Sequence, residues 1–173
     1  MKTRRLGKDG PQVSAPGEVE VRERLLSFLR EHQVLTLAVT EADGSAYAAA
    51  LFYGVDDDLR FYVVTDPGTR HGQAMLANPV VAGTVQRDCQ QWREIQGVQF
   101  RGLCRQLGGT ARARAWEIYT ARFRFLQQPN AILTRELAST AIWGIEPTWI
   151  RLIDNQAGFG HKEEWTPPAA DGR

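Results

Sequence analysis

The sequence predicts a mainly β (α+β) fold in which six antiparallel strands close into a barrel with helices at its margins. Six segments rich in β-branched and apolar residues are separated by short polar turns. Other segments place their apolar residues at helical spacing. Closure into a barrel is expected because it removes the exposed sheet edges that invite aggregation.

The composition indicates one globular domain. A chain of 173 residues with 43% hydrophobic content has enough apolar material to bury a core. The formal net charge is only +1, which argues against generic nucleic-acid or membrane-surface binding. Cys89 and Cys104 form no Cys-x-x-Cys unit, so a reducing cytoplasm is the expected location. No segment approaches the roughly 20 apolar residues of a membrane-spanning helix.

The first half of the chain predicts one helix and a three-stranded antiparallel meander. From Glu18 to Glu31, apolar and charged residues alternate at helical spacing. Asp43-Gly44 is typical of a tight hairpin turn, and Asp66-Pro67-Gly68 breaks the chain after the third strand. The three strands are expected at Val34–Thr40, Ala46–Val55 and Leu59–Thr65.

The second half predicts three more strands and three helical segments. A short helix ends before Pro79, because proline cannot continue it. Thr110 is placed as the N-cap of a longer helix, and Pro147 is expected to interrupt the last strand. The strands are expected at Val80–Val85, Ile95–Leu107 and Ala141–Ile153, and the helices at Thr69–Asn78, at Ala111–Phe125 and after Pro129.

The end of the third strand carries the residues that point to chemistry. A helix that begins at Thr69 presents backbone N–H groups without internal partners, and its dipole adds partial positive charge. Thr65 and Thr69 add hydroxyl donors. Arg70 offers a planar fork for two oxygens, and His71 adds a further donor, so the group suits a terminal phosphate. Spacing alone equally allows a second interpretation, in which Thr69 only caps the helix and Arg70 and His71 are solvated.

These residues also carry a resemblance to a known family. The strand order, with Phe61-Tyr62, Thr65, the Thr69-Arg70-His71 triplet and Ala77–Ala82, resembles the pyridoxamine-phosphate-oxidase-like, FMN-binding split-barrel superfamily over roughly Glu18–Asp154. The resemblance implies a six-stranded Greek-key split barrel that binds flavin mononucleotide (FMN). The chain is most similar to a small subgroup with shared segments at Gly97–Gly102, Asp154-Asn155, Gly158–Gly160 and Trp165.

The resemblance implies a set of cofactor-binding residues. In this family a Ser or Thr, an Arg and usually a Lys at the triplet hold the FMN phosphate, so His71 departs from the usual third residue. The flavin ring lies along the second and third strands, where small side chains such as alanines permit close backbone approach. The same alanines also fit simple packing under a helix. Gln96 is the nearest match to a family glutamine near the fifth strand. The implied set is Ala49, Ala50, Val64, Thr65, Thr69, Arg70, His71 and Gln96.

The resemblance further implies a homodimer whose two flavin sites straddle the interface. The chain then divides into a disordered N-terminal tail over 1–16, an FMN-binding split-barrel domain over 17–155 and a C-terminal tail over 156–173. The segment Gly158–Lys162 is expected either to cover the partner's site or to be a frayed end. Trp165 is the tryptophan expected to contact the cofactor.

The expected function is that of an FMN-dependent oxidoreductase acting on a small molecule. No catalytic side chain is assigned, because the flavin itself carries the chemistry. The family's pyridoxamine-phosphate oxidases carry a substrate-binding Arg-Leu-x-Pro ending that this chain lacks, so pyridoxine phosphate is not the expected substrate. No metal site is predicted, because His32, His71 and His161 lack the spacing of metal ligands.

Two alternatives stay open from the sequence. One is a non-catalytic module of the same fold that stores or senses flavin or holds haem, with His161 as the histidine free to be an axial ligand. The other is a split barrel that has lost its ligand.

Overall fold

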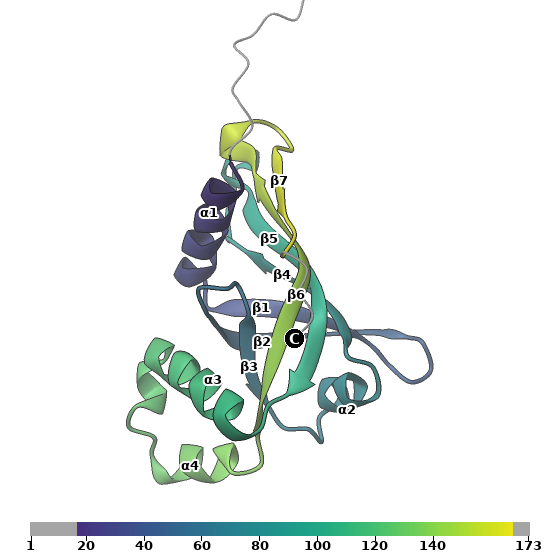
Figure 1. The fold of residues 1–173 in the computed structure, drawn as a ribbon, viewed down its shortest axis with the longest axis vertical. Helices are drawn as coiled ribbons and strands as arrows, with labels where there is room; N and C mark the ends of the chain where they lie inside the picture. Colours follow the sequence, from purple (N-terminus) through teal and green to yellow (C-terminus); the bar gives the residue numbers. More distant parts are fainter. Residues whose placement is uncertain (1–16, 168–173) are drawn as a thin grey trace, which may run out of the picture.

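The computed structural model describes residues 17–167, which contain seven strands and four α-helices (Figure 1). The predicted tail over 1–16 lies outside the described residues. The helices are α1 (Glu18–Glu31), α2 (Arg70–Ala77), α3 (Gly109–Arg122) and α4 (Ala131–Leu137), with short 3-10 helices η1 (Trp92–Glu94), η2 (Arg124–Leu126) and η3 (Asn155–Ala157). The strands are β1 (Val34–Thr40), β2 (Ala46–Val55), β3 (Phe61–Thr65), β4 (Val80–Gln86), β5 (Gln96–Gln106), β6 (Ala141–Asp154) and β7 (Lys162–Trp165). Within these residues no helix has the length and apolar character needed to cross a membrane.

Six of the strands close into a barrel. The sheet runs in the order β3-β2-β1-β4-β5-β6-β7, and an additional pairing between β3 and β6 closes the first six of these strands into a ring. Every pairing is antiparallel. The predicted six-stranded antiparallel barrel is therefore confirmed. β7 pairs with β6 on the same edge as β3, farther along the strand, because β5 occupies the other edge.

The barrel is split between β2 and β3. These two strands pair only where Tyr53–Val55 meets Phe61–Val63. Beyond this point β3 continues along β6 as far as Thr65, while β2 follows β1 over the register Val34↔Phe52 to Thr40↔Ala46. The edge of β2 from Ala46 to Phe52 therefore pairs with β1 alone and leaves backbone groups available on its other side.

The helices pack on different parts of the barrel. Leu25 and Leu29 of α1 and Met75 of α2 are buried in the same core as the barrel interior. In contrast, α3 packs outside the barrel on β2, β3 and β6, where Tyr119 joins a second, smaller core cluster with Tyr62. Figure 1 shows α3 and α4 together at one side of the barrel, and α2 beside the other.

Three details differ from the sequence-based expectations. Pro147 does not interrupt β6, because a register shift opposite Arg101 and Gly102 accommodates it as a β-bulge. Thr110 is not an N-cap, since α3 begins one residue earlier with Gly108 at the cap and no side-chain capping bond. The segment expected to be a C-terminal tail contains β7, which pairs with Ile150–Ile153 of β6.

Candidate functional site

The turn between β3 and α2 is a tightly bonded anion-facing corner. Gly68 N–H donates to Asp66 Oδ1 (2.6 Å), and Thr69 N–H donates to Asp66 O (3.1 Å). Thr69 is the N-cap of α2, and its Oγ1 accepts a bond from Gly72 N–H at 3.2 Å. The capping role of Thr69 is thus confirmed. The first turn of α2 contains no acidic residue, so nothing within the helix neutralises its positive end.

Gly72 allows this turn to lie directly on the first turn of the helix. A Cβ atom at this position would lie 2.6 Å from Asp66 O and 2.7 Å from Pro67 O. No larger residue fits without moving backbone atoms, so the geometry of the corner depends on this glycine.

The His71 side chain is buried behind the corner, so the interpretation of His71 as a solvated first-turn residue is wrong. Its Nε2 lies 2.7 Å from Thr65 Oγ1 and 3.2 Å from Thr69 Oγ1. Burial lowers the pKa of His71, which favours the neutral ring at neutral pH. The ring therefore links the two hydroxyl groups that were predicted to face a phosphate.

Arg70 points away from the helix and grips a carboxylate. Its Nε donates to Glu41 Oε1 (2.5 Å) and its terminal NH2 group donates to Glu41 Oε2 (2.6 Å). The guanidinium also lies 5.0 Å from the ring centre of Tyr47. Hydrogen bonds from Arg70 lower the pKa of Glu41. The arginine predicted to hold a phosphate thus holds two oxygens of one anionic group in this structure.

The predicted ring-facing residues lie on the two strands that diverge. Ala49 pairs with Leu37 and Ala50 with Thr36, so both lie on the part of β2 that has no partner on its second side. Val64 lies on β3 beyond its last pair with β2. Ala49, Ala50 and Val64 therefore lie on the two strands where the barrel is split, and Val64 packs against the core cluster that includes Tyr119 of α3.

Gln96 lies elsewhere in the chain. It begins β5 opposite Asp154, and its side chain donates to Asp154 Oδ1 at 3.1 Å. The end of β5 that packs against α2 is the other one, where Cys104 Sγ lies 3.3 Å from Met75 Sδ. Within one chain, Gln96 is thus separated from the corner at Thr65 by the length of β5.

The C-terminal segment is held in place by this same chain. Trp165 is buried in the barrel core and pairs with Ile150, so it is not free to reach across an interface. His161 Nε2 lies 2.7 Å from Glu163 Oε1, a carboxylate that also pairs with Arg24. His161 Nε2 is therefore engaged by a carboxylate of the same chain, and axial ligation through Nδ1 stays a prediction.

The outside of the sheet carries a second notable surface, which we call the outer face. The pairing register aligns two rows of side chains across five strands. The rows are Ala50, Thr36, Thr84, Gln99 and Arg151, and Ala48, Ala38, Ala82, Arg101 and Trp149. The short side chains at one end form the floor of an open hollow of about 490 Å³. This floor continues to Ala50 at the split of the barrel.

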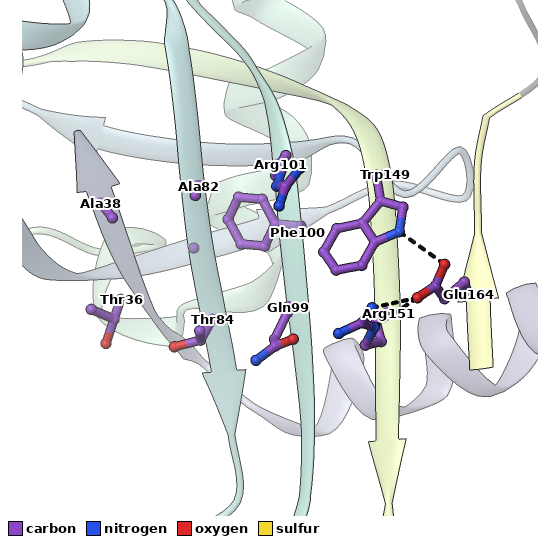
Figure 2. Close-up of a pocket in the computed structure, with 11 residues that line it drawn as sticks. Thr36, Ala38, Ala82, Thr84, Gln99, Phe100, Arg101, Trp149, Arg151 and Glu164 are labelled. Atoms are coloured by element: carbon purple, nitrogen blue, oxygen red, sulfur yellow. Dashed lines mark hydrogen bonds and ion pairs between the residues drawn. The ribbon is translucent and has the colours of Figure 1, made fainter. Parts of the chain in front are cut away.

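One tryptophan forms the wall of this hollow. Figure 2 shows Trp149 between Arg101 and Arg151, whose guanidinium carbons lie 5.4 and 4.7 Å from its ring. Arg151 Nε donates to Glu164 Oε1 at 2.9 Å, and Trp149 Nε1 donates to Glu164 Oε2 at 3.3 Å. The wall is therefore fixed by cation–π contacts and by a carboxylate from β7.

Sequence reasoning missed Glu41 and Tyr47, although both are close to the predicted site. They flank the Asp43-Gly44 hairpin, which was recognised only as a turn. Their role depends on how far β1 and β2 project past the barrel toward α2, and no local pattern encodes that distance.

Comparisons with known proteins bear on the family. Residues 21–154 match the family model described as "Pyridoxamine 5'-phosphate oxidase". A "UPF0306 protein" of Klebsiella pneumoniae (strain 342) is 37% identical over 139 residues, which span 80% of this chain and 88% of that protein.

Two solved structures share the fold at low sequence identity. A structure titled as a heme binding protein from Mycobacterium smegmatis has a TM-score of 0.68 at 16% identity. The match spans 90% of this chain and only 60% of that one. Campylobacter jejuni ChuZ has a TM-score of 0.72 at 14% identity, over 94% of this chain and 67% of that one. The family match over residues 21–154 and the closed six-stranded barrel agree, and the chain belongs to the pyridoxamine 5'-phosphate oxidase-like split-barrel superfamily.

Proposed function

We propose that this protein binds FMN and acts as a flavin-dependent oxidoreductase on a small molecule other than pyridoxamine phosphate. The observation that carries this proposal is the corner between β3 and α2, where the Thr65 and Thr69 hydroxyls meet at His71 and Arg70 follows in the first turn of the helix. The corner lies near the free edge of β2. Cofactor contact by the other residues of the implied set stays a prediction. A reducing cytoplasm remains the location we infer, and Cys89 and Cys104 are both free thiols.

The corner suits a phosphate on three grounds. The start of α2 offers backbone N–H groups and partial positive charge without an acidic residue in its first turn. The Thr65 and Thr69 hydroxyls are held together by the buried His71 ring. Arg70 already binds an anion in bidentate fashion, and a phosphate offers the same geometry with more negative charge than Glu41. Phosphate binding at Arg70 then requires that Glu41 gives way.

The split of the barrel suits a planar ring. Backbone N–H and C=O groups along Ala46–Phe52 have no strand partner on the side that faces β3. Such groups bond to the polar edge of a flavin, and the short side chains of Ala49 and Ala50 permit close approach. Bound FMN would supply the redox chemistry, while these residues would orient it.

We also infer that a second copy of the chain completes the site. The outer face carries small side chains at the end that reaches Ala50, beside the proposed ring position. Val34 and Val80 are 46% and 57% exposed near it, so the patch presents apolar area to a partner. In such a dimer, we assign Gln96 to the flavin site that the two chains form together.

A haem-binding module is the second candidate function. It is favoured by the fold shared with the structure titled as a heme binding protein, but His161 is already engaged by Glu163. The visible spectrum of the purified protein separates the candidates. We expect flavin absorption bands and their bleaching by NADPH or NADH without oxygen. A Soret band with no flavin bands would favour haem, and bound FMN that no nicotinamide reduces would favour a carrier.

Arg70 and Glu41 form an exposed ion pair, and substituting one or the other should change the affinity for FMN in opposite directions. Arg70→Ala should weaken FMN binding by about tenfold or more, because charge-assisted bonds to a phosphate are lost. Glu41→Gln should strengthen it several-fold, because the guanidinium no longer has a competing carboxylate. Quenching of flavin fluorescence on titration measures both affinities.

Arg112→Ala is a matched control, since Arg112 is exposed on α3 and away from the corner. Riboflavin, which lacks the phosphate, should bind wild type and Arg70→Ala alike. Equal FMN affinity in wild type and Arg70→Ala would contradict the assigned phosphate site.

The pH dependence of stability should reveal the buried state of His71. Because its pKa is lowered in the native state, the unfolded chain binds the proton more readily once the pH falls below the ordinary value of about 6.5. The free energy of unfolding should therefore decrease between about pH 7 and pH 5 through this group. His71→Gln retains a polar group near Thr65 and should show a smaller decrease in urea unfolding. An equal decrease in both proteins would contradict this assignment.

The oligomeric state tests the outer face. We expect a dimer by light scattering, and Ala82→Glu should shift it to monomer because a charge enters the middle of the face. Ala121→Glu is the control, because it introduces the same charge on the exposed side of α3, and it should leave the dimer intact. A monomeric wild type, or a dimer that Ala82→Glu leaves intact, would overturn the assignment.

A further inference from the structure

A cavity outside the barrel lies between the start of α3 and the strands β3, β5 and β6. It has a volume of about 590 Å³, within the range of small-molecule sites. We call it the arginine cavity, because Arg60, Arg105 and Arg114 line it together with Tyr62, Leu103 and Leu107. None of its lining residues belongs to the predicted FMN-binding set.

The floor of the cavity exists because a glycine occupies the middle of a cross-strand row. Gly144 of β6 pairs with Tyr62 on one side and with Arg105 on the other. A Cβ atom at Gly144 would lie 3.1 Å from the nearest side-chain atom of Leu107. The missing side chain thus leaves room for Leu107, whose side chain packs on Gly144 and lines the cavity.

The charge of the cavity is unbalanced. Its only lining carboxylate is Glu146, against three arginines. Arg60 lies 3.4 Å from Asp58, whereas the ion pairs found in residues 17–167 include none for Arg105 or Arg114. Two guanidinium groups therefore have their bidentate donors available for an anion.

The helix start adds to this positive character. Thr110 and Ala111 of the first turn of α3 line the cavity. Gly108 provides no side-chain cap, and the first turn contains no acidic residue. The unpaired N–H groups and the dipole of α3 therefore favour negative charge at the same place as the arginines.

The remaining walls are apolar. Leu103 and Leu107 contribute aliphatic surface. The Tyr62 hydroxyl donates to the buried Asp56 Oδ2 at 2.7 Å, so this phenol is satisfied and presents its ring. A ligand that fits both halves has an anionic group and an apolar body.

We propose that the arginine cavity is a second binding site, for a small organic anion that carries a carboxylate or phosphate on an apolar body. Arg105 and Arg114 bind the anionic group, and Tyr62 with the leucines contacts the body. The site is independent of the FMN site, because the two share no residue.

Naphthoate and naphthyl phosphate are probes that join each anionic group to an apolar ring. We expect calorimetry to show that both probes bind the full-length protein. Neutral naphthol and inorganic phosphate should bind with an affinity at least about tenfold lower. The tighter of the two anionic probes identifies the preferred head group. Arg105→Gln with Arg114→Gln should weaken binding of the preferred probe by about tenfold or more.

Arg112→Gln is the control on the same helix and should bind like wild type. Arg70→Gln should also bind like wild type, which separates this site from the FMN site. Methyl NMR of the unmodified protein adds a readout that needs no variant, with shifts expected for Leu103 and Leu107. No probe binding, equal binding by the Arg105/Arg114 variant, or loss in Arg70→Gln would overturn the proposal.

Discussion

The pairing of β3 with β6 is the constraint on which the rest of the structure depends. This pairing closes the barrel and takes β3 away from β2 after three residue pairs. The divergence of β3 from β2 has two effects. It leaves one edge of β2 unpaired, and it places the end of β3 and the start of α2 beside that edge. Tyr47 on β2, whose ring lies nearly parallel to that of His71 at 6.3 Å, marks how closely the two parts approach.

The charged and polar groups at this corner differ in how they contribute to folding. An exposed ion pair such as Arg70 with Glu41 contributes little to folding, because water screens it. It does hold the guanidinium in the orientation that a bidentate anion needs, over the ring of Tyr47. The buried groups act differently. Burial lowers the pKa of His71, and its ring contacts both the Thr65 and Thr69 hydroxyls, so the polar lining of the corner is held within the chain itself.

Strand β5 supplies cations to two separate surfaces. Arg101 lies on the outer face beside Trp149, and Arg105 lies in the arginine cavity beside Gly144. Both side chains point out of the barrel, and the bulge opposite Pro147 lies between them. The outer face offers small side chains on an open sheet and suits a protein partner. The cavity beside the start of α3 is lined by three arginines and is the proposed site for a small organic anion.

The sequence by itself determined the elements whose signals are local. The spacing of apolar residues predicted one helix and two strands with the bounds observed, at Glu18–Glu31, Val34–Thr40 and Ala46–Val55. The triplet that begins at Thr69 located the start of α2. The tertiary structure alone decided what depends on distant pairing. β7 is too short to show the alternation of apolar and polar residues that marks a strand, and it is a strand because it pairs with the edge of β6. The Glu41 partner of Arg70 and the arginine cavity likewise depend on contacts between segments far apart in the chain. Closure of the barrel creates these contacts, and residue spacing does not encode them.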